Sequence, residues 1–243
     1  MEFGFLSFMV SILSITLGAV LQASTGLGAG LVVVPFLALI SLELVPGPVI
    51  FASVSLSSLM TYAGRHHIKK AHLDKVVGGL VIGMIVGILS LSAIPSSSLG
   101  LMFGTLILVA VIASSVGLKL ESTPVNSVTA GAVSGFMGTT AAIGAPVLAL
   151  LYQHEEGKTL RATLAVLYLF SSIGMLLLLH LAGRFGQHEF LLGCWLIPGF
   201  VLGYFLAGRI ARMLDRGYSR AAVLVISSVS ALILIAKSFQ GPG

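Results

Sequence analysis

Two stretches of the sequence place neutral hydrogen-bond donors beside glycines inside otherwise apolar sequence. The first is STGLGAGLVVVPF, which starts at Ser24, and the second is GTTAAIGAP, which starts at Gly138. Hydroxyl groups, side-chain amides and backbone N–H groups bind anions without a fixed positive charge, and glycine allows close approach to the backbone. The sequence therefore predicts an anion site. Its candidate residues are Gln22, Ser24, Thr25, Gly28, Gly30, Thr139, Thr140 and Gly144.

The composition shows what kind of molecule must hold these residues. Of 243 residues, 57% are hydrophobic and only 9% are charged, and the mean hydropathy is +1.09. A hydrocarbon core of about 30 Å takes roughly 20 helical residues. Stretches such as 76–94 and 99–118 are about that long and contain no charged side chain. Continuous apolar runs favour helices over a barrel of alternating strands. We expect an all-α polytopic protein in a lipid bilayer.

Ten helical segments are expected, five in each half of the chain. Residues 1–120 form the first predicted repeat and residues 121–243 the second. Four short segments match between the halves at a period of about 111 to 116 residues. They are Gly18-Ala19-Val20 with Gly131-Ala132-Val133, PFLALI from Pro35 with PVLALL from Pro146, Ser57-Ser58 with Ser171-Ser172, and Gly83 and Gly87 with Gly199 and Gly203. We attribute the last four glycines to close helix packing.

The positive charges alternate between loops in a way that indicates inverted halves. The loop 65–75 is basic whereas its counterpart 183–189 holds one arginine, and the loop 209–220 is basic whereas its counterpart 91–98 has no charge. Basic loops stay on the cytoplasmic side, so loops 65–75 and 209–220 are predicted to be cytoplasmic in a bacterial inner membrane. The net charge of +5 is explained by these loops, and no nucleic-acid partner is expected.

The glycine-rich stretches interrupt two helices that are otherwise apolar enough for a membrane. Interrupted helices survive in a bilayer only where protein or a water-filled cavity supplies partners for the freed backbone groups. Inverted halves would bring both interruptions, as broken or re-entrant hairpins, together near the midplane. There the new helix N-termini would present N–H groups and positive dipole ends to one space, which favours anions.

Other classes of function have weaker support in the sequence. No Asp or Glu falls inside a predicted span, and no P-loop motif for ATP is present. An intramembrane enzyme would need a catalytic pair or a metal-ligand cluster in the spans, so the chain is not predicted to be an enzyme and no cofactor is expected. An anion channel using the same dipole-lined site is the alternative to a transporter. The expected partners are a small anion and the lipid bilayer, and self-association into a homo-oligomer is left open.

The chain resembles the TauE/SafE family of membrane proteins over nearly its whole length. The resemblance rests on STGLGAGLVVVP in the first half and on AGAVSGFMGTTAAIGAP in the second, with Gly131, Gly135, Gly144 and Pro146. In the first half this chain has Gly28-Ala29-Gly30 where the family more often has consecutive glycines. The resemblance implies an inner-membrane transporter that exports a small sulfur-containing anion such as sulfite or an organosulfonate. Without an ATP motif we expect secondary transport, and the inverted halves predict alternating access. Sulfur as the substrate element comes from the resemblance alone.

Overall fold

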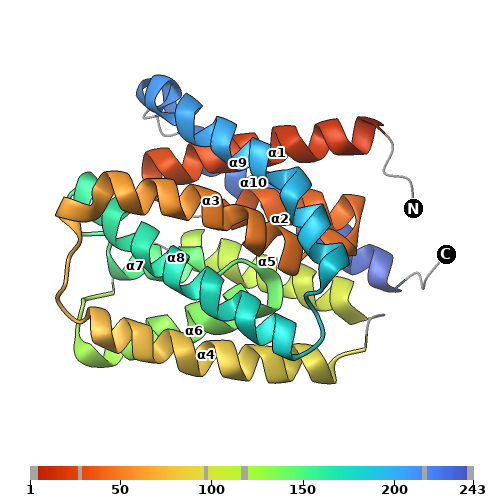
Figure 1. Cartoon of the computed structure of the whole chain (residues 1–243), viewed down its shortest axis with the longest axis horizontal. Coiled ribbons are helices and arrows are strands. Elements are labelled where there is room, and N and C mark those ends of the chain that lie inside the picture. The colour runs from red at the N-terminus through yellow and green to blue at the C-terminus, as the bar shows by residue number, and fades with distance from the viewer. Residues whose placement is uncertain (1–4, 27–28, 96–97, 116–119, 215–217, 240–243) are drawn as a thin grey trace.

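The computed structural model describes residues 5–26, 29–95, 98–115, 120–214 and 218–239, and every regular element in these ranges is helical (Figure 1). The α-helices are α1 Phe5–Thr25, α2 Gly30–Ile40, α3 Gly47–Gly64, α4 Leu73–Ala93, α5 Leu99–Ser115, α6 Pro124–Ala141, α7 Ala145–Leu151, α8 Gly157–Leu181, α9 Gln187–Leu214 and α10 Tyr218–Phe239. Two short 3-10 turns, η1 Leu42–Leu44 and η2 Arg65–His67, flank α3. The prediction of an all-α protein with ten helical segments is confirmed within the described ranges.

Four of the described helices are long and apolar enough to cross a membrane. They are α1 over Ser7–Thr25, α4, α8, and α9 over Gln187–Arg209. Shorter apolar helices are found at α2, at α5 and at Ser227–Ser238 within α10. Together they make the chain a polytopic membrane protein, as its composition predicts.

The two interruptions begin where a helix ends on a residue with positive φ. Gly26, at φ 81°, follows α1, and Ala142, at φ 58°, follows α6. After α6 the N–H of Ala142 donates to the carbonyl of Gly138, and the N–H of Ile143 donates to the carbonyl of Met137 at 3.2 Å. These bonds satisfy carbonyls at the end of α6. The chain then reverses into α7, just as it does from α1 into α2.

The helices pack as pairs drawn from opposite halves of the chain. α1 lies against α9, α6 against α4, α3 against α8 and α5 against α10. In Figure 1, α4 and α6 lie along one side of the bundle, α1 and α9 along the other, and α3 and α8 lie between them. A Cβ added at Gly83 would overlap the carbonyl of Ala132, and one at Gly203 would lie 2.7 Å from the carbonyl of Thr16. The packing role predicted for these two glycines is confirmed.

Two basic residues mark the opposite ends of the bundle. At the end where α8 begins, Lys69 forms an ion pair with Glu155, and the backbone N–H of Lys69 donates to the hydroxyl of Thr163 at 2.9 Å. At the other end, where α4 finishes, Arg184 donates from Nη2 to the carbonyl of Leu91 at 3.1 Å. The loop around Lys69 and the loop around Arg184 therefore lie at opposite ends, about 30 Å apart along α4 at 1.5 Å per residue.

Candidate functional site

The two interruptions meet inside the bundle. A Cβ added at Gly30, the first residue of α2, would overlap the carbonyl oxygen of Ala142 and lie 3.4 Å from the Cα of Ile143. A Cβ added at Gly144 would overlap the carbonyl oxygen of Ser134 on α6. Only glycine allows backbone to touch backbone at this distance. Gly30 thus allows direct contact between the two broken hairpins, and Gly144 allows close contact within the second one.

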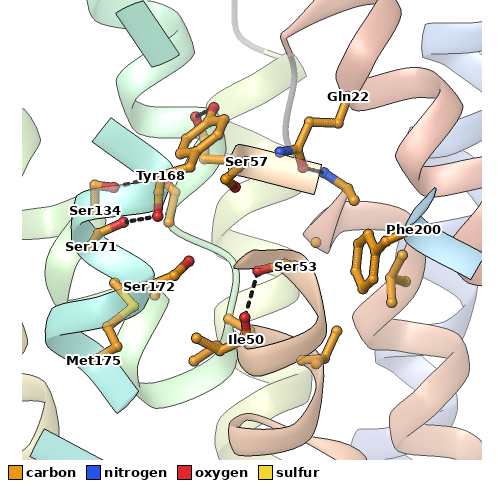
Figure 2. A pocket seen from close by; sticks show the side chains of 18 residues that line it. Gln22, Ile50, Ser53, Ser57, Ser134, Tyr168, Ser171, Ser172, Met175 and Phe200 are labelled. Atoms are coloured by element: carbon orange, nitrogen blue, oxygen red, sulfur yellow. Dashed lines mark hydrogen bonds between the residues drawn. The ribbon is translucent and has the colours of Figure 1, made fainter. Parts of the chain in front are cut away.

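A cavity of about 70 Å³ lies where the interruptions meet (Figure 2). Its walls come from both broken hairpins and from α3, α8 and α9. The polar side chains that line it are Gln22, Ser53, Ser57, Ser134, Tyr168, Ser171 and Ser172, and no Asp, Glu, Lys, Arg or His is among the lining residues. The cavity therefore offers neutral hydrogen-bond donors and no fixed charge.

Two serine hydroxyls are available to a ligand in this cavity. Ser57 on α3 is 1% exposed, and its Oγ is buried without a hydrogen-bond partner among the described residues. Ser172 on α8 is 7% exposed and points toward the centre of the cavity in Figure 2. A buried hydroxyl without a partner loses hydrogen-bonding free energy. A ligand that accepts from these two hydroxyls would recover it.

The other three serines of the cavity already donate to backbone carbonyls. Ser53 donates to Ile50 at 2.8 Å, Ser134 to Gly144 at 2.8 Å and Ser171 to Tyr168 at 3.1 Å. The bond from Ser134 joins α6 to the residue just before α7, so it closes the second interruption. The hydroxyls of these three serines therefore stabilise the backbone around the cavity and are not free to donate to a ligand.

Gln22 and Tyr168 hold the interruptions in place. The buried Oε1 of Gln22 accepts from the backbone N–H of Ala29 at 2.6 Å, across the first interruption, and its amide nitrogen faces the cavity (Figure 2). The hydroxyl of Tyr168 donates to the carbonyl of Gly26 at 3.0 Å and lies 3.4 Å from the carbonyl of Ala145. One side chain of α8 therefore contacts both interruptions at once.

The structure brings three of the residues predicted from the sequence to the cavity, namely Gln22, Gly30 and Gly144. Four others lie elsewhere, and Gly28 lies outside the described residues. The threonines donate to carbonyls of their own helices: Thr25 to Leu21, Thr139 to Gly135 and Thr140 to Phe136, at 2.7 to 2.9 Å. The Oγ of Ser24 is buried without a partner in the described structure, but this residue does not line the cavity.

Sequence analysis missed the serines of α3 and α8 as site residues. A signal for them existed, because Ser57-Ser58 matches Ser171-Ser172 between the two halves. The structure places Ser57, Ser171 and Ser172 around one cavity, on the two helices that pack against each other across the halves. Polar residues that recur at matching positions of a repeat are thus a better guide to this cavity than polar residues beside a glycine.

The described residues contain no group of three or more His, Cys, Asp or Glu side chains close enough to hold a metal ion. The cavity offers hydroxyl, amide and backbone groups, which suit hydrogen bonding to an anion with oxygen atoms.

Comparison with known families gives one match, which covers most of the chain. The family model described as sulfite exporter TauE/SafE matches residues 11–234. Comparison with curated proteins and with solved structures found no match. The family match spans both interruptions, the cavity between them and all four helix pairs, and on that ground the chain belongs to the TauE/SafE family of membrane transporters.

Proposed function

We propose that the protein carries a small sulfur oxyanion, sulfite or an organosulfonate, across the membrane through the cavity between its two interrupted hairpins. The observation that carries this proposal is the cavity lining, which has hydroxyl and amide donors and no carboxylate to repel an anion. Family membership supports the substrate class, since the matching family is described as sulfite exporters.

The size of the cavity is consistent with such a ligand. A single water needs roughly 10 to 15 Å³ on this measure, so about 70 Å³ has room for about five waters or for one ion of four or five heavy atoms. Neutral donors also bind an anion less tightly than a buried arginine or lysine would, and a charged residue inside a bilayer is costly. Moderate affinity allows the ligand to leave on the other side.

Transport by alternating access between two inverted halves is the mechanism that we infer. The helix pairs support it, because the contacts are repeated between the halves: α1 with α9 is equivalent to α6 with α4, and α3 and α5 pack against their own counterparts α8 and α10. In Figure 1, α4 runs from left to right and its counterpart α9 from right to left, which is the sense that inverted halves require. Rocking of one set of helices against the other would open the cavity to each side in turn.

The basic end of the bundle, with Lys69, Lys158 and Arg161, is proposed to face the cytoplasm of a bacterial cell, following the positive-inside rule. The end that carries Arg184 would then face outward. This orientation places the Lys69 ion pair and the beginning of α8 on the cytoplasmic side.

Flux measurements on reconstituted protein test the proposal. A carrier gives saturable uptake of radiolabelled sulfite and exchanges it for unlabelled sulfite across the membrane. An anion channel gives conductance far above a carrier's turnover and no such exchange, and that result would replace the carrier mechanism.

Substitutions on α3 test whether the cavity is the site. Ser57→Ala removes an unpartnered hydroxyl, so the fold loses no hydrogen bond, but an anion would lose a donor worth about 1.5 to 3 kcal/mol. We expect sulfite binding to weaken about 10-fold or more. Ser58→Ala is the matched control, because Ser58 is the neighbouring serine on the same helix and is exposed outside the cavity. Equal binding by both variants would remove the cavity from the proposal.

A further inference from the structure

A second hollow lies at the basic end of the protein. Its volume is about 350 Å³, and its lining includes Ala23, Gly64, His67, Lys158 and Arg161. We refer to this hollow as the vestibule. It sits between the last turn of α1, the last turn of α3 and the first turns of α8, and no Asp or Glu is among its lining residues.

Among the residues that the structure describes, no carboxylate forms an ion pair with the cations of the vestibule. Lys69 nearby is paired with Glu155, whereas within the described part of the chain neither Lys158 nor Arg161 forms an ion pair. Both residues lie in the first two turns of α8, where the helix dipole is positive and favours acidic side chains. The positive-inside rule explains why cations lie at this end of the protein. An anion in the vestibule would stabilise these two where the helix dipole disfavours them.

The end of α1 separates the vestibule from the cavity between the interruptions. On the vestibule side, Nη1 of Arg161 donates to the carbonyl of Ser24 at 3.1 Å. On the cavity side, the hydroxyl of Tyr168 donates to the carbonyl of Gly26 at 3.0 Å. Tyr168 lies seven positions after Arg161 on α8, which is about 10 Å along the helix. Two residues on one face of α8 thus hold the same short segment at two points.

We propose that the vestibule is a second oxyanion site, where an anion from the basic side binds to Lys158 and Arg161 before it reaches the cavity. The proposal rests on the function proposed above. An oxyanion in the vestibule competes with the carbonyl of Ser24 for the guanidinium of Arg161. An anion bound in the vestibule therefore breaks the bond between Arg161 and the end of α1, on the side from which the anion arrives. In this way Arg161 couples anion binding in the vestibule to the first interruption.

Binding of radiolabelled sulfite to purified protein in detergent tests this proposal. We expect Lys158→Gln to weaken one of two binding events about 5-fold at low salt, the size typical of one charge at a partly exposed site. Lys158 is exposed, so its loss leaves the fold intact. The matched control is Lys70→Gln, which removes the same charge from an exposed position outside the vestibule and is expected to change nothing.

A second pair of variants separates the two sites. Arg161→Gln is expected to weaken the same event as Lys158→Gln, whereas Ser57→Ala with Ser172→Ala weakens the other event. If only the lysine and arginine variants change binding, the vestibule stands and the proposed cavity site fails. If only the serine variants change binding, the vestibule proposal is overturned and the cavity site stands.

Free solute and lipid headgroup share the oxyanion chemistry that the vestibule would recognise. Nanodiscs with phosphatidylglycerol offer a phosphate headgroup in competition with sulfite. If the event that depends on Lys158 persists there, the occupant is a solute. If it is lost while the other event remains, the occupant is the headgroup. Binding that is insensitive to Lys158 and Arg161 in both settings contradicts an oxyanion site in the vestibule.

Discussion

Gln22 offers the sharpest test of the cavity, because its two ends have different roles. Its Oε1 accepts from the backbone N–H of Ala29 across the first interruption, and its amide nitrogen faces the cavity. Gln22→Glu keeps an acceptor for Ala29 but replaces the donor with a carboxylate. Gln22→Leu removes both. The pair of variants therefore separates the support of the backbone from the binding of an anion.

The magnitudes follow from the geometry. A cavity of about 70 Å³ places the centre of an anion about 5 Å from a carboxylate at position 22. Two like charges at that distance repel by about 3 kcal/mol at an effective dielectric constant of about 20. That free energy corresponds to roughly 100-fold weaker binding. Gln22→Leu instead leaves the buried N–H of Ala29 without a partner, which costs about 1 to 3 kcal/mol of stability.

The assay is equilibrium binding of radiolabelled methanesulfonate, together with thermal unfolding in detergent. We expect Gln22→Glu to bind about 100-fold more weakly, and Gln22→Leu, which adds no charge to the cavity, to weaken binding by less. Both are expected to unfold at a lower temperature, the first because it buries a charge and the second because it leaves the N–H of Ala29 without a partner. Gln187→Glu, at the exposed start of α9, is the matched control for the added charge. A folded Gln22→Glu protein that binds as tightly as the wild type would refute the placement of the anion in this cavity.

Three further predictions concern the interruptions and the orientation of the chain. Gly30→Ala pushes a methyl group against the carbonyl of Ala142 and is expected to lower the free energy of unfolding by about 1 to 3 kcal/mol. The control Gly78→Ala, at a position with open space around it, is expected to be neutral or stabilising. If the two variants were equally stable, the hairpins would not touch. Ala142→Gly relieves the positive φ and is expected to stabilise the protein by about 0.5 to 1 kcal/mol. Ala141→Gly, inside the helix, is expected to destabilise it by about 1 kcal/mol. Chemical unfolding measures both changes, and changes of the same sign would contradict the observed end of α6. In a background with Cys194→Ser, Lys70→Cys and Gln187→Cys are expected to react with an impermeant thiol reagent from opposite faces of the membrane, and labelling of both from one face would exclude the proposed topology.

The positions of the helices follow closely from the sequence, because apolar length and glycine or proline placement decide them. The end of α6 does not. Sequence analysis expects a break from Gly138 onward, but the helix continues to Ala141. Thr139 and Thr140 donate to carbonyls of the preceding turn, and Ala142 takes the left-handed conformation that a sequence rule reserves for glycine. Their hydroxyls are therefore used inside the helix rather than in the cavity.

The repeat marks the position of serines on α3 and α8, but it does not tell which hydroxyls are free for a ligand. A serine in an apolar helix can satisfy its hydroxyl on its own backbone, as Ser53 does, or turn it toward a ligand, as Ser57 does. The residue type is the same in both cases, so the sequence does not tell the two apart. The meeting of the two glycine-rich interruptions, in contrast, follows from a general rule, because backbone freed from a helix in a membrane must find partners.

The neutral lining of the cavity has a consequence for energetics. Because no side chain there neutralises an anion, a loaded protein of the proposed kind moves net negative charge across the bilayer and an empty one moves none. A membrane potential, negative inside, then drives the anion outward with about 2.3 kcal/mol per charge for every 100 mV. That energy sustains roughly a 50-fold concentration ratio for a monovalent ion. Electrogenic export therefore needs no coupling cation, and collapsing the potential with valinomycin and potassium should abolish the outward bias.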